Sequence, residues 1–229
     1  GATHSLVALV HHPLALETGL SAAVSASLRA SERAALACAR HVIATSTTTA
    51  RLLAADYDVP SERLSVVEPG TERVASPPRR VESVIALLAV GAVVPRKGYD
   101  VLVAALARLK HLPWRLVIAG DCGRSVDTFR RLVADVAALG LSDRVRLAGT
   151  VTAEELASLY ASADLFVLPS RFEGYGMAYA EAIAHGVPVI GTNAGAIPET
   201  VPADAGVLVP PDDVDMLAAT LQRLMDNPA

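Results

Sequence analysis

The chain has 229 residues, which is enough for one large domain or two modest ones. Hydrophobic residues make up 52% of it and aromatic residues only 4%, so Ala, Val and Leu must build the core, as is common in layered α/β proteins. The formal net charge of −4 argues against a general nucleic-acid-binding protein, because affinity for a phosphate backbone needs clustered Lys and Arg.

Cysteine usage and hydropathy indicate a soluble cytoplasmic protein. Cys38 and Cys122 have no partner at metal-ligand spacing, and we predict that both are buried thiols in a reducing compartment. The sequence has no run of 18 uninterrupted apolar residues, and its start lacks the basic-then-apolar order of a secretory signal.

Short β-branched runs alternate with longer segments of helical period. The first part of the chain predicts strands at 5–10, 42–45 and 64–67, and helices at 21–39 and 47–55. A turn at 68–71 and the proline-containing segment 76–80 then interrupt this alternation. We therefore predict a domain boundary between residues 77 and 78.

The alternation continues beyond this boundary. It predicts strands at 84–90, 115–119, 145–148, 165–168 and 187–190, and helices at 99–110, 126–139, 153–161, 177–185 and 214–225. Repeated strand–helix–strand units imply a parallel sheet with helices on both faces, because each crossover is right-handed and contains a helix. Ligands of such sheets bind at the carboxyl ends of the strands.

Segment 169–182 (PSRFEGYGMAYAEA) follows an apolar strand and leads into a helix. Gly174 and Gly176 allow close approach of a ligand, and the unpaired N–H groups of the first helical turn attract an anion such as a pyrophosphate. Glu173 and Glu181 are eight positions apart, so they suit the hydroxyls of two separate sugar rings. The alternative is an ordinary turn in which Glu173 caps the helix and Glu181 faces solvent.

A second candidate element, residues 91–98 (GAVVPRKG), follows predicted strand 84–90. Arg96 and Lys97 would project over the same strand-end crevice, where cations neutralise a diphosphate and stabilise it as a leaving group. The alternative is a solvated pair of charges at the start of a helix.

His11 and His12 follow the first predicted strand, so they lie at a strand end that faces the cleft, where imidazoles can serve as hydrogen-bonding groups near neutral pH. Either histidine could instead stabilise the loop beside Pro13. Glu17 either orients an acceptor hydroxyl or begins the following helix.

The spacing of Glu173 and Glu181, followed by AHGVPVI at 184–190 and GAIPE at 195–199, resembles the retaining GT-B glycosyltransferases of glycosyltransferase family 4. This family contains sucrose synthases and bacterial mannosyl- and glucosyltransferases. Four further segments agree with it in order, namely 95–100, 116–121, 145–151 and 163–170. The resemblance extends from about residue 42 to the end of the chain.

The resemblance implies an α/β fold with two Rossmann-like domains of GT-B type. Residues 1–77 would form a partial acceptor-side domain, and residues 78–229 would bind the nucleotide sugar. Nothing like the family's opening strand and glycine-rich loop precedes Gly1, so we expect the first domain to be incomplete at its N-terminus.

The resemblance also implies transfer of a hexose from a UDP- or GDP-linked donor to an acceptor hydroxyl, with retention and without a metal or cofactor. By similarity Glu173 contacts the sugar, Glu181 the ribose and Lys97 the diphosphate, and the loop with Gly149 and Val151 lies near the base. The implied catalytic residues are His11 and Glu173, and the implied donor-binding residues are Arg96, Lys97, Gly149, Val151, Glu173, Gly174, Tyr175, Gly176, Met177 and Glu181. His12 and Glu17 are candidate acceptor-binding residues.

The acceptor would be a small molecule or a lipid-linked one, which leaves peripheral membrane contact open, and the sequence does not indicate an oligomeric state. One position departs from the family, because Ala92 stands where an Arg usually follows the glycine that ends the strand. A truncated or non-catalytic nucleotide-sugar-binding protein therefore remains an alternative. A GT-B epimerase is a further one, although it would need an acid–base pair that the sequence does not reveal.

Overall fold

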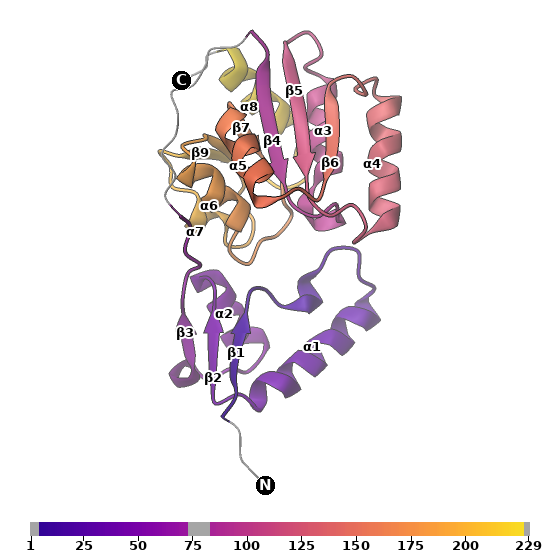
Figure 1. The fold of residues 1–229 in the computed structure, drawn as a ribbon. Coiled ribbons are helices and arrows are strands. Elements are labelled where there is room, and N and C mark those ends of the chain that lie inside the picture. The colour runs from indigo at the N-terminus through magenta and orange to yellow at the C-terminus, as the bar shows by residue number, and fades with distance from the viewer. Residues whose placement is uncertain (1–4, 73–82, 227–229) are drawn as a thin grey trace.

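The computed structural model describes residues 5–72 and 83–226, which form two parallel β-sheets with helices packed against them (Figure 1). The expected α/β architecture is confirmed. Residues 5–72 and 83–226 each contain one of the sheets, and we call them the first and the second domain. The predicted boundary between residues 77 and 78 lies outside the described residues.

The first sheet has three parallel strands in the order β1-β2-β3. Hydroxyl caps fix where its helices begin, since Ser21 and Ser46 each accept a hydrogen bond from a backbone N–H three residues later. The elements are β1 (Val7–Val10), α1 (Ala22–Ala37), β2 (His41–Ala44), α2 (Thr47–Asp56) and β3 (Leu64–Val66), with 3-10 turns at Leu14–Leu16 and Ser61–Arg63.

The second sheet has six parallel strands in the order β6-β5-β4-β7-β8-β9. Its strands are β4 (Ile85–Val90), β5 (Trp114–Ala119), β6 (Val145–Gly149), β7 (Leu165–Val167), β8 (Val189–Thr192) and β9 (Gly206–Val209). Its helices are α3 (Tyr99–Ala107), α4 (Val126–Ala138), α5 (Ala153–Ser162), α6 (Met177–Ala184), α7 (Ile197–Thr200) and α8 (Val214–Asp226), with a 3-10 turn at Pro95–Lys97.

The strand order reverses between β4 and β7. From β4 the chain moves outward through β5 to β6, and it then returns to place β7 on the other side of β4. Ligands of open α/β sheets bind at such a switch point, outside the carboxyl ends of the strands. The segments that follow β4 and β7 meet here, since the N–H of Arg171 donates to the carbonyl of Arg96 over 2.7 Å.

Three details differ from the sequence prediction. Strand β9 and helix α7 were not predicted, and α7 has only four residues, too few to show a helical periodicity. Strand β8 begins two residues later than expected, since the N–H of Val187 still bonds to the end of α6, at the carbonyl of Ala182. The prediction of two buried thiols was wrong, because Cys38 at the end of α1 is exposed and Cys122 is partly exposed.

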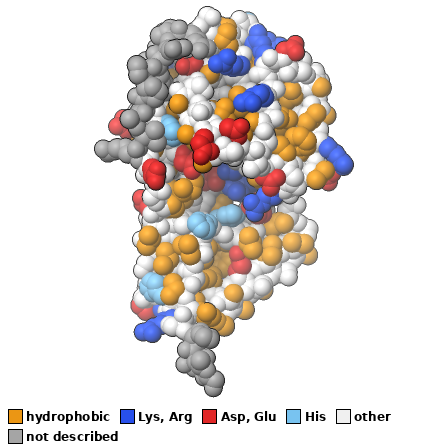
Figure 2. Space-filling view, in the orientation of Figure 1, with side chains coloured by type: hydrophobic (Ala, Val, Ile, Leu, Met, Phe, Trp, Pro, Cys, Tyr) orange, Lys and Arg blue, Asp and Glu red, His pale blue; other side chains and the backbone are white. Residues whose placement is uncertain are grey.

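Charged and histidine side chains gather on the surface between the part of the chain that contains the first sheet and the part that contains the second (Figure 2). None of the helices in residues 5–72 and 83–226 has both the length and the apolar character needed to cross a bilayer.

Candidate active site

A cavity of about 360 Å³ lies at the strand ends, between the two parts of the chain. The predicted residues Lys97, Glu173 and Glu181 all line it. The first part of the chain contributes His11, His12 and Thr45, and the second contributes Val90, Gly91, Lys97, Leu156, Glu173, Gly174, Tyr175, Gly176, Met177, Ala178 and Glu181.

A larger cavity of about 490 Å³ lies where β5 and β6 begin, and its lining includes Arg115 and Arg146. This is the opposite end of the sheet from the one at which parallel α/β folds bind ligands. Because the strand-end cavity also gathers residues from both parts of the chain, we take it as the candidate active site despite its smaller volume.

Glu173 is a buried carboxylate with three donors around it. Its Oε1 accepts hydrogen bonds from Lys97 Nζ and Ser170 Oγ, each at 2.7 Å, and its Oε2 accepts one from Arg96 Nη1 at 3.0 Å. Burial raises the pKa of Glu173, but the charges of Lys97 and Arg96 outweigh this effect and hold it below its ordinary value. Glu173 is therefore ionised at neutral pH, and it does not cap the helix.

The glycine turn, residues 174–176, leads into α6 without a side-chain cap. Gly176 is the N-cap residue, has a φ of 100° and offers no side chain to bond the first N–H groups of the helix. Met177 and Ala178, the first residues of α6, line the cavity. The start of this helix thus presents unpaired donors and the positive end of a dipole to the cavity, which suits an anion.

Glu181 lies on α6 and lines the same cavity. The hydroxyl of Tyr160 on α5 donates to its Oε2 over 2.9 Å, and the ring of Tyr160 stacks on that of His185 with 5.0 Å between centroids. Burial and the nearby Glu181 charge raise the pKa of Tyr160 well above its ordinary value, so the hydroxyl remains a donor. Sequence reasoning missed Tyr160, because nothing local marks a tyrosine 21 positions away as a partner of Glu181.

Arg96 and Lys97 are not a solvated pair, since their side chains are only 11% and 12% exposed. Lys97 lines the cavity and passes over Gly91, where a β-carbon would stand 2.8 Å from Lys97 Cε. Arg96 contacts the other carboxylate oxygen of Glu173, Oε2, and it is not among the described residues that line the cavity. Its Nη1 also donates to the carbonyl of Phe172 over 2.7 Å.

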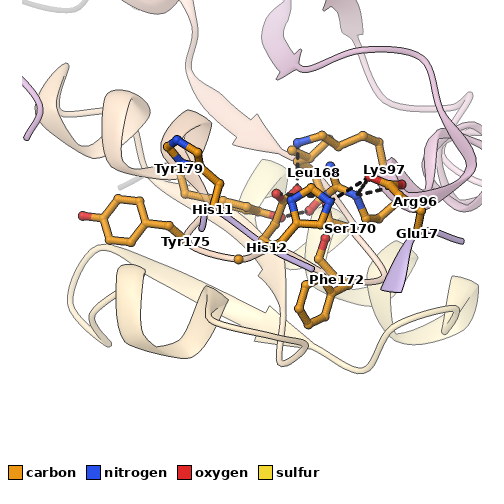
Figure 3. Close-up of polar contacts among 12 residues, drawn as sticks. His11, His12, Glu17, Arg96, Lys97, Leu168, Ser170, Phe172, Tyr175 and Tyr179 are labelled. Atoms are coloured by element: carbon orange, nitrogen blue, oxygen red, sulfur yellow. Dashed lines mark hydrogen bonds and ion pairs between the residues drawn. The ribbon is translucent and has the colours of Figure 1, made fainter. Parts of the chain in front are cut away.

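The histidine loop, residues 11–17 of the first part of the chain, contacts Arg96 and so reaches the charged groups around Glu173. His12 Nε2 lies 2.9 Å from Glu17 Oε1, and Arg96 Nε donates to both Glu17 oxygens over 3.3 Å. The hydrogen bond with His12 lowers the pKa of Glu17, and Arg96 lowers it further. Glu17 does not begin α1, which starts at Ala22. Figure 3 shows His12, Glu17 and Arg96 together with His11. His11 is exposed and lines the cavity.

Gly149 and Val151 follow β6 and are absent from the described lining of the cavity. Strand β5 separates β6 from β4, so Gly149 lies about two strand spacings, roughly 10 Å, from the end of β4. The structure therefore places these two residues on the same edge of the sheet as the cavity but away from its centre.

A group of hydroxyls joins the first part of the chain to the glycine turn. Ser46 Oγ and Thr49 Oγ1 donate to the carbonyl of Gly174 over 2.6 and 3.0 Å. Ser46 caps α2, and Thr49 lies in its first turn. At the start of this helix, the carboxylate of Glu199 also accepts hydrogen bonds from Thr47 N and Thr48 Oγ1. Sequence reasoning missed these residues, because serine and threonine at a helix start are also explained by local capping.

No group of three or more His, Cys, Asp or Glu side chains that could hold a metal ion occurs within residues 5–72 and 83–226.

Two parallel sheets with a cavity between them, at their strand ends, define the class of protein: an α/β fold similar to that of GT-B glycosyltransferases. Sucrose-phosphate synthase from Thermosynechococcus elongatus superposes with a TM-score of 0.82 and 28% identity, over 97% of this chain and 59% of that one. Anabaena HepE in complex with UDP-glucose superposes with a TM-score of 0.82 at 22% identity, over 97% of this chain and 63% of that one, which shows a shared fold.

The chain belongs to the family described as glycosyl transferases group 1, whose model matches residues 85–227. It is 33% identical to the MMP alpha-(1->4)-mannosyltransferase of Mycolicibacterium hassiacum, over 97% of this chain and 57% of that protein. It is 36% identical to the D-inositol 3-phosphate glycosyltransferase of Thermobispora bispora, over 83% of this chain and 49% of that protein. The chain thus spans about half the length of these relatives.

Proposed function

We propose that this protein transfers a hexose from a nucleoside-diphosphate sugar to an acceptor hydroxyl, with retention at the anomeric carbon. The observation that carries the proposal is the shared cavity of Lys97, Glu173 and Glu181 at the start of α6. One cation, one helix start and two separated carboxylates match a ligand made of a sugar, a diphosphate and a ribose.

Each group has a task in this reaction. The bond between the anomeric carbon and the phosphate oxygen breaks, and the nucleoside diphosphate leaves with the bonding electrons. The acceptor oxygen bonds to the same face of the carbon, and the proton of the acceptor hydroxyl passes to the departing phosphate oxygen. Lys97 and the N–H groups at the start of α6 stabilise the charge that develops on the leaving diphosphate. Glu173 binds a sugar hydroxyl, and Glu181, held by Tyr160, binds the ribose.

The histidine loop supplies the acceptor side of the proposal. His11 and His12 line the cavity from the first domain, next to the glycine turn, so an acceptor hydroxyl that enters from this side meets an imidazole. The activities for which two relatives are named support a hexose donor. One is an MMP mannosyltransferase, and the other is a GDP-mannose-dependent mannosyltransferase of Corynebacterium glutamicum that is 38% identical over 59% of this chain.

A thermal-shift panel of UDP- and GDP-linked glucose and mannose, with the parent nucleotides, tests the donor. A bound nucleotide sugar raises the melting temperature by mass action. Glu181→Ala should weaken binding of both nucleotide and nucleotide sugar, whereas Glu62→Ala, an exposed glutamate of the first domain, should not. Unchanged affinity in Glu181→Ala would remove the ribose role, and no binding of any panel member would remove the donor site.

Retention has its own measurement. The anomeric configuration of a transfer product, read by NMR, should match that of the donor. An inverted product would contradict retention, while binding without any transfer would favour the non-catalytic alternative that Ala92 keeps open.

A further inference from the structure

Arg96 lies between two carboxylates from different parts of the chain. Its Nε donates to both oxygens of Glu17 over 3.3 Å, and its Nη1 donates to Glu173 Oε2 over 3.0 Å. A further bond from Nη1 to the carbonyl of Phe172, at 2.7 Å, fixes the plane of the guanidinium. Arg96 thereby joins Glu17 of the first domain to Glu173 of the second. Figure 3 shows Arg96 next to Glu17.

The donors around Glu173 leave room for one more. An ionised carboxylate offers about four acceptor positions, two on each oxygen. Lys97 and Ser170 occupy both positions of Oε1, and Arg96 occupies one position of Oε2. The position that remains on Oε2 can accept a single hydroxyl, and the direction in which it points depends on where Arg96 holds the carboxylate.

Arg96 has the wrong surroundings for a phosphate ligand. Lys97 and Glu173 are among the described residues that line the cavity, whereas Arg96 is not, and Arg96 contacts Glu173 at Oε2. Its Nε and Nη1 already donate to two carboxylates and a carbonyl, so turning these groups toward a diphosphate would leave Glu17 and Glu173 without those bonds. Loss of such charge-assisted bonds at a buried carboxylate is costly.

We propose that Arg96 is a positioning residue, which orients Glu173 toward the donor sugar and does so only while Glu17 of the first domain holds it in place. This inference rests on the proposed function. It makes recognition of the sugar, but not of the diphosphate, depend on contact between the two domains. Lysine is a poor substitute, because a single ammonium cannot bridge both carboxylates in the planar fork of a guanidinium.

The test compares two ligands by calorimetry: the nucleoside diphosphate and the nucleotide sugar that the wild-type protein binds in the thermal-shift panel. We expect Arg96→Gln to bind the nucleoside diphosphate within about twofold of wild type, and to bind the nucleotide sugar roughly tenfold more weakly, as expected for a lost bond to a charged group. Arg96→Lys should restore little of this loss.

A second pair of variants checks the link to the first domain. Glu17→Gln, a milder change at a partly exposed residue, should reproduce the selective loss for the nucleotide sugar. It should add almost nothing in an Arg96→Gln background, because the two residues act through one contact. Lys97→Ala should weaken both the nucleoside diphosphate and the nucleotide sugar, and Arg223→Gln, at an exposed site on α8, should weaken neither.

Each other outcome overturns the inference. Equal losses for the two ligands in Arg96→Gln would place Arg96 on the diphosphate, and no loss for either would give it no part in binding. A selective loss in Arg96→Gln without one in Glu17→Gln would remove the dependence on the first domain. If the wild-type protein binds neither ligand, the proposed donor site itself fails, and that result is distinguishable from the other three.

Discussion

Gly174 lies directly against the carbonyl oxygen of His11, so closely that a β-carbon on Gly174 would stand 1.8 Å from this oxygen. The glycine turn of the second domain and the histidine loop of the first therefore meet backbone to backbone. The carbonyl of His11 is in turn held by Thr45 Oγ1 over 3.1 Å, so it has little freedom to move aside. This close approach of the two domains thus requires that residue 174 carry no side chain.

This contact predicts the effect of Gly174→Ala. A methyl group cannot fit against the backbone of His11, so the domains should separate at this point and the hydroxyl contacts of Ser46 and Thr49 with the Gly174 carbonyl should break. Small-angle X-ray scattering should report a larger radius of gyration, and thermal unfolding a lower midpoint. The matched control is Gly70→Ala, since no atom lies within 4 Å of a β-carbon there. Unchanged scattering in Gly174→Ala would contradict the contact.

Removal of the Lys97 ammonium should weaken binding of the diphosphate. If Lys97 neutralises this group, Lys97→Ala should lower affinity for the nucleoside diphosphate by roughly 10- to 100-fold, the range for a hydrogen bond to a charged group. Calorimetry at fixed ionic strength measures it, with the exposed Lys110→Ala as the control for a lost surface charge. A loss of less than about twofold would show that the diphosphate does not contact Lys97.

Tyr160→Phe should weaken nucleotide binding without harming the fold. The phenylalanine ring can keep the stacking against His185, while the 2.9 Å hydrogen bond to Glu181 Oε2 is lost. We expect roughly a 3- to 10-fold loss of nucleotide affinity, because Glu181 is then free to rotate away from the ribose. In a Glu181→Ala background the same substitution should change affinity very little. A full loss in that background would mean that Tyr160 acts independently of Glu181.

Acid should weaken the bridge between Glu17 and its partners His12 and Arg96. The pKa of Glu17 is lowered from its ordinary value of 4.5, so its ionised form favours the folded state. Its stabilising contribution is fully present above about pH 4.5 and is lost as the pH falls through the lower pKa of the folded protein. The difference in melting temperature between wild type and Glu17→Gln should therefore be constant from about pH 6 to 4.5 and shrink as the pH falls further. A difference that grows on acidification would contradict this assignment.

The order of the strands and helices other than α7 and β9 was predictable from the sequence alone, because it depends on local periodicity and on turn residues. The segments around Gly174 and around Lys97 were also identifiable as strand-end elements, since a parallel sheet places all carboxyl ends of its strands along one edge. That Lys97, Glu173 and Glu181 share one cavity followed from the switch point between β4 and β7, which the order of elements suggests but does not prove.

What only the tertiary structure decided is which side chains hold these groups. The bonds from Arg96 to Glu17, from Tyr160 to Glu181, and from Ser46 to Gly174 span 79, 21 and 128 positions of the chain. Such pairs leave no mark in local spacing, because hydrogen bonds of this kind are set by the packing of elements against one another, and that packing arises only when the whole core is buried.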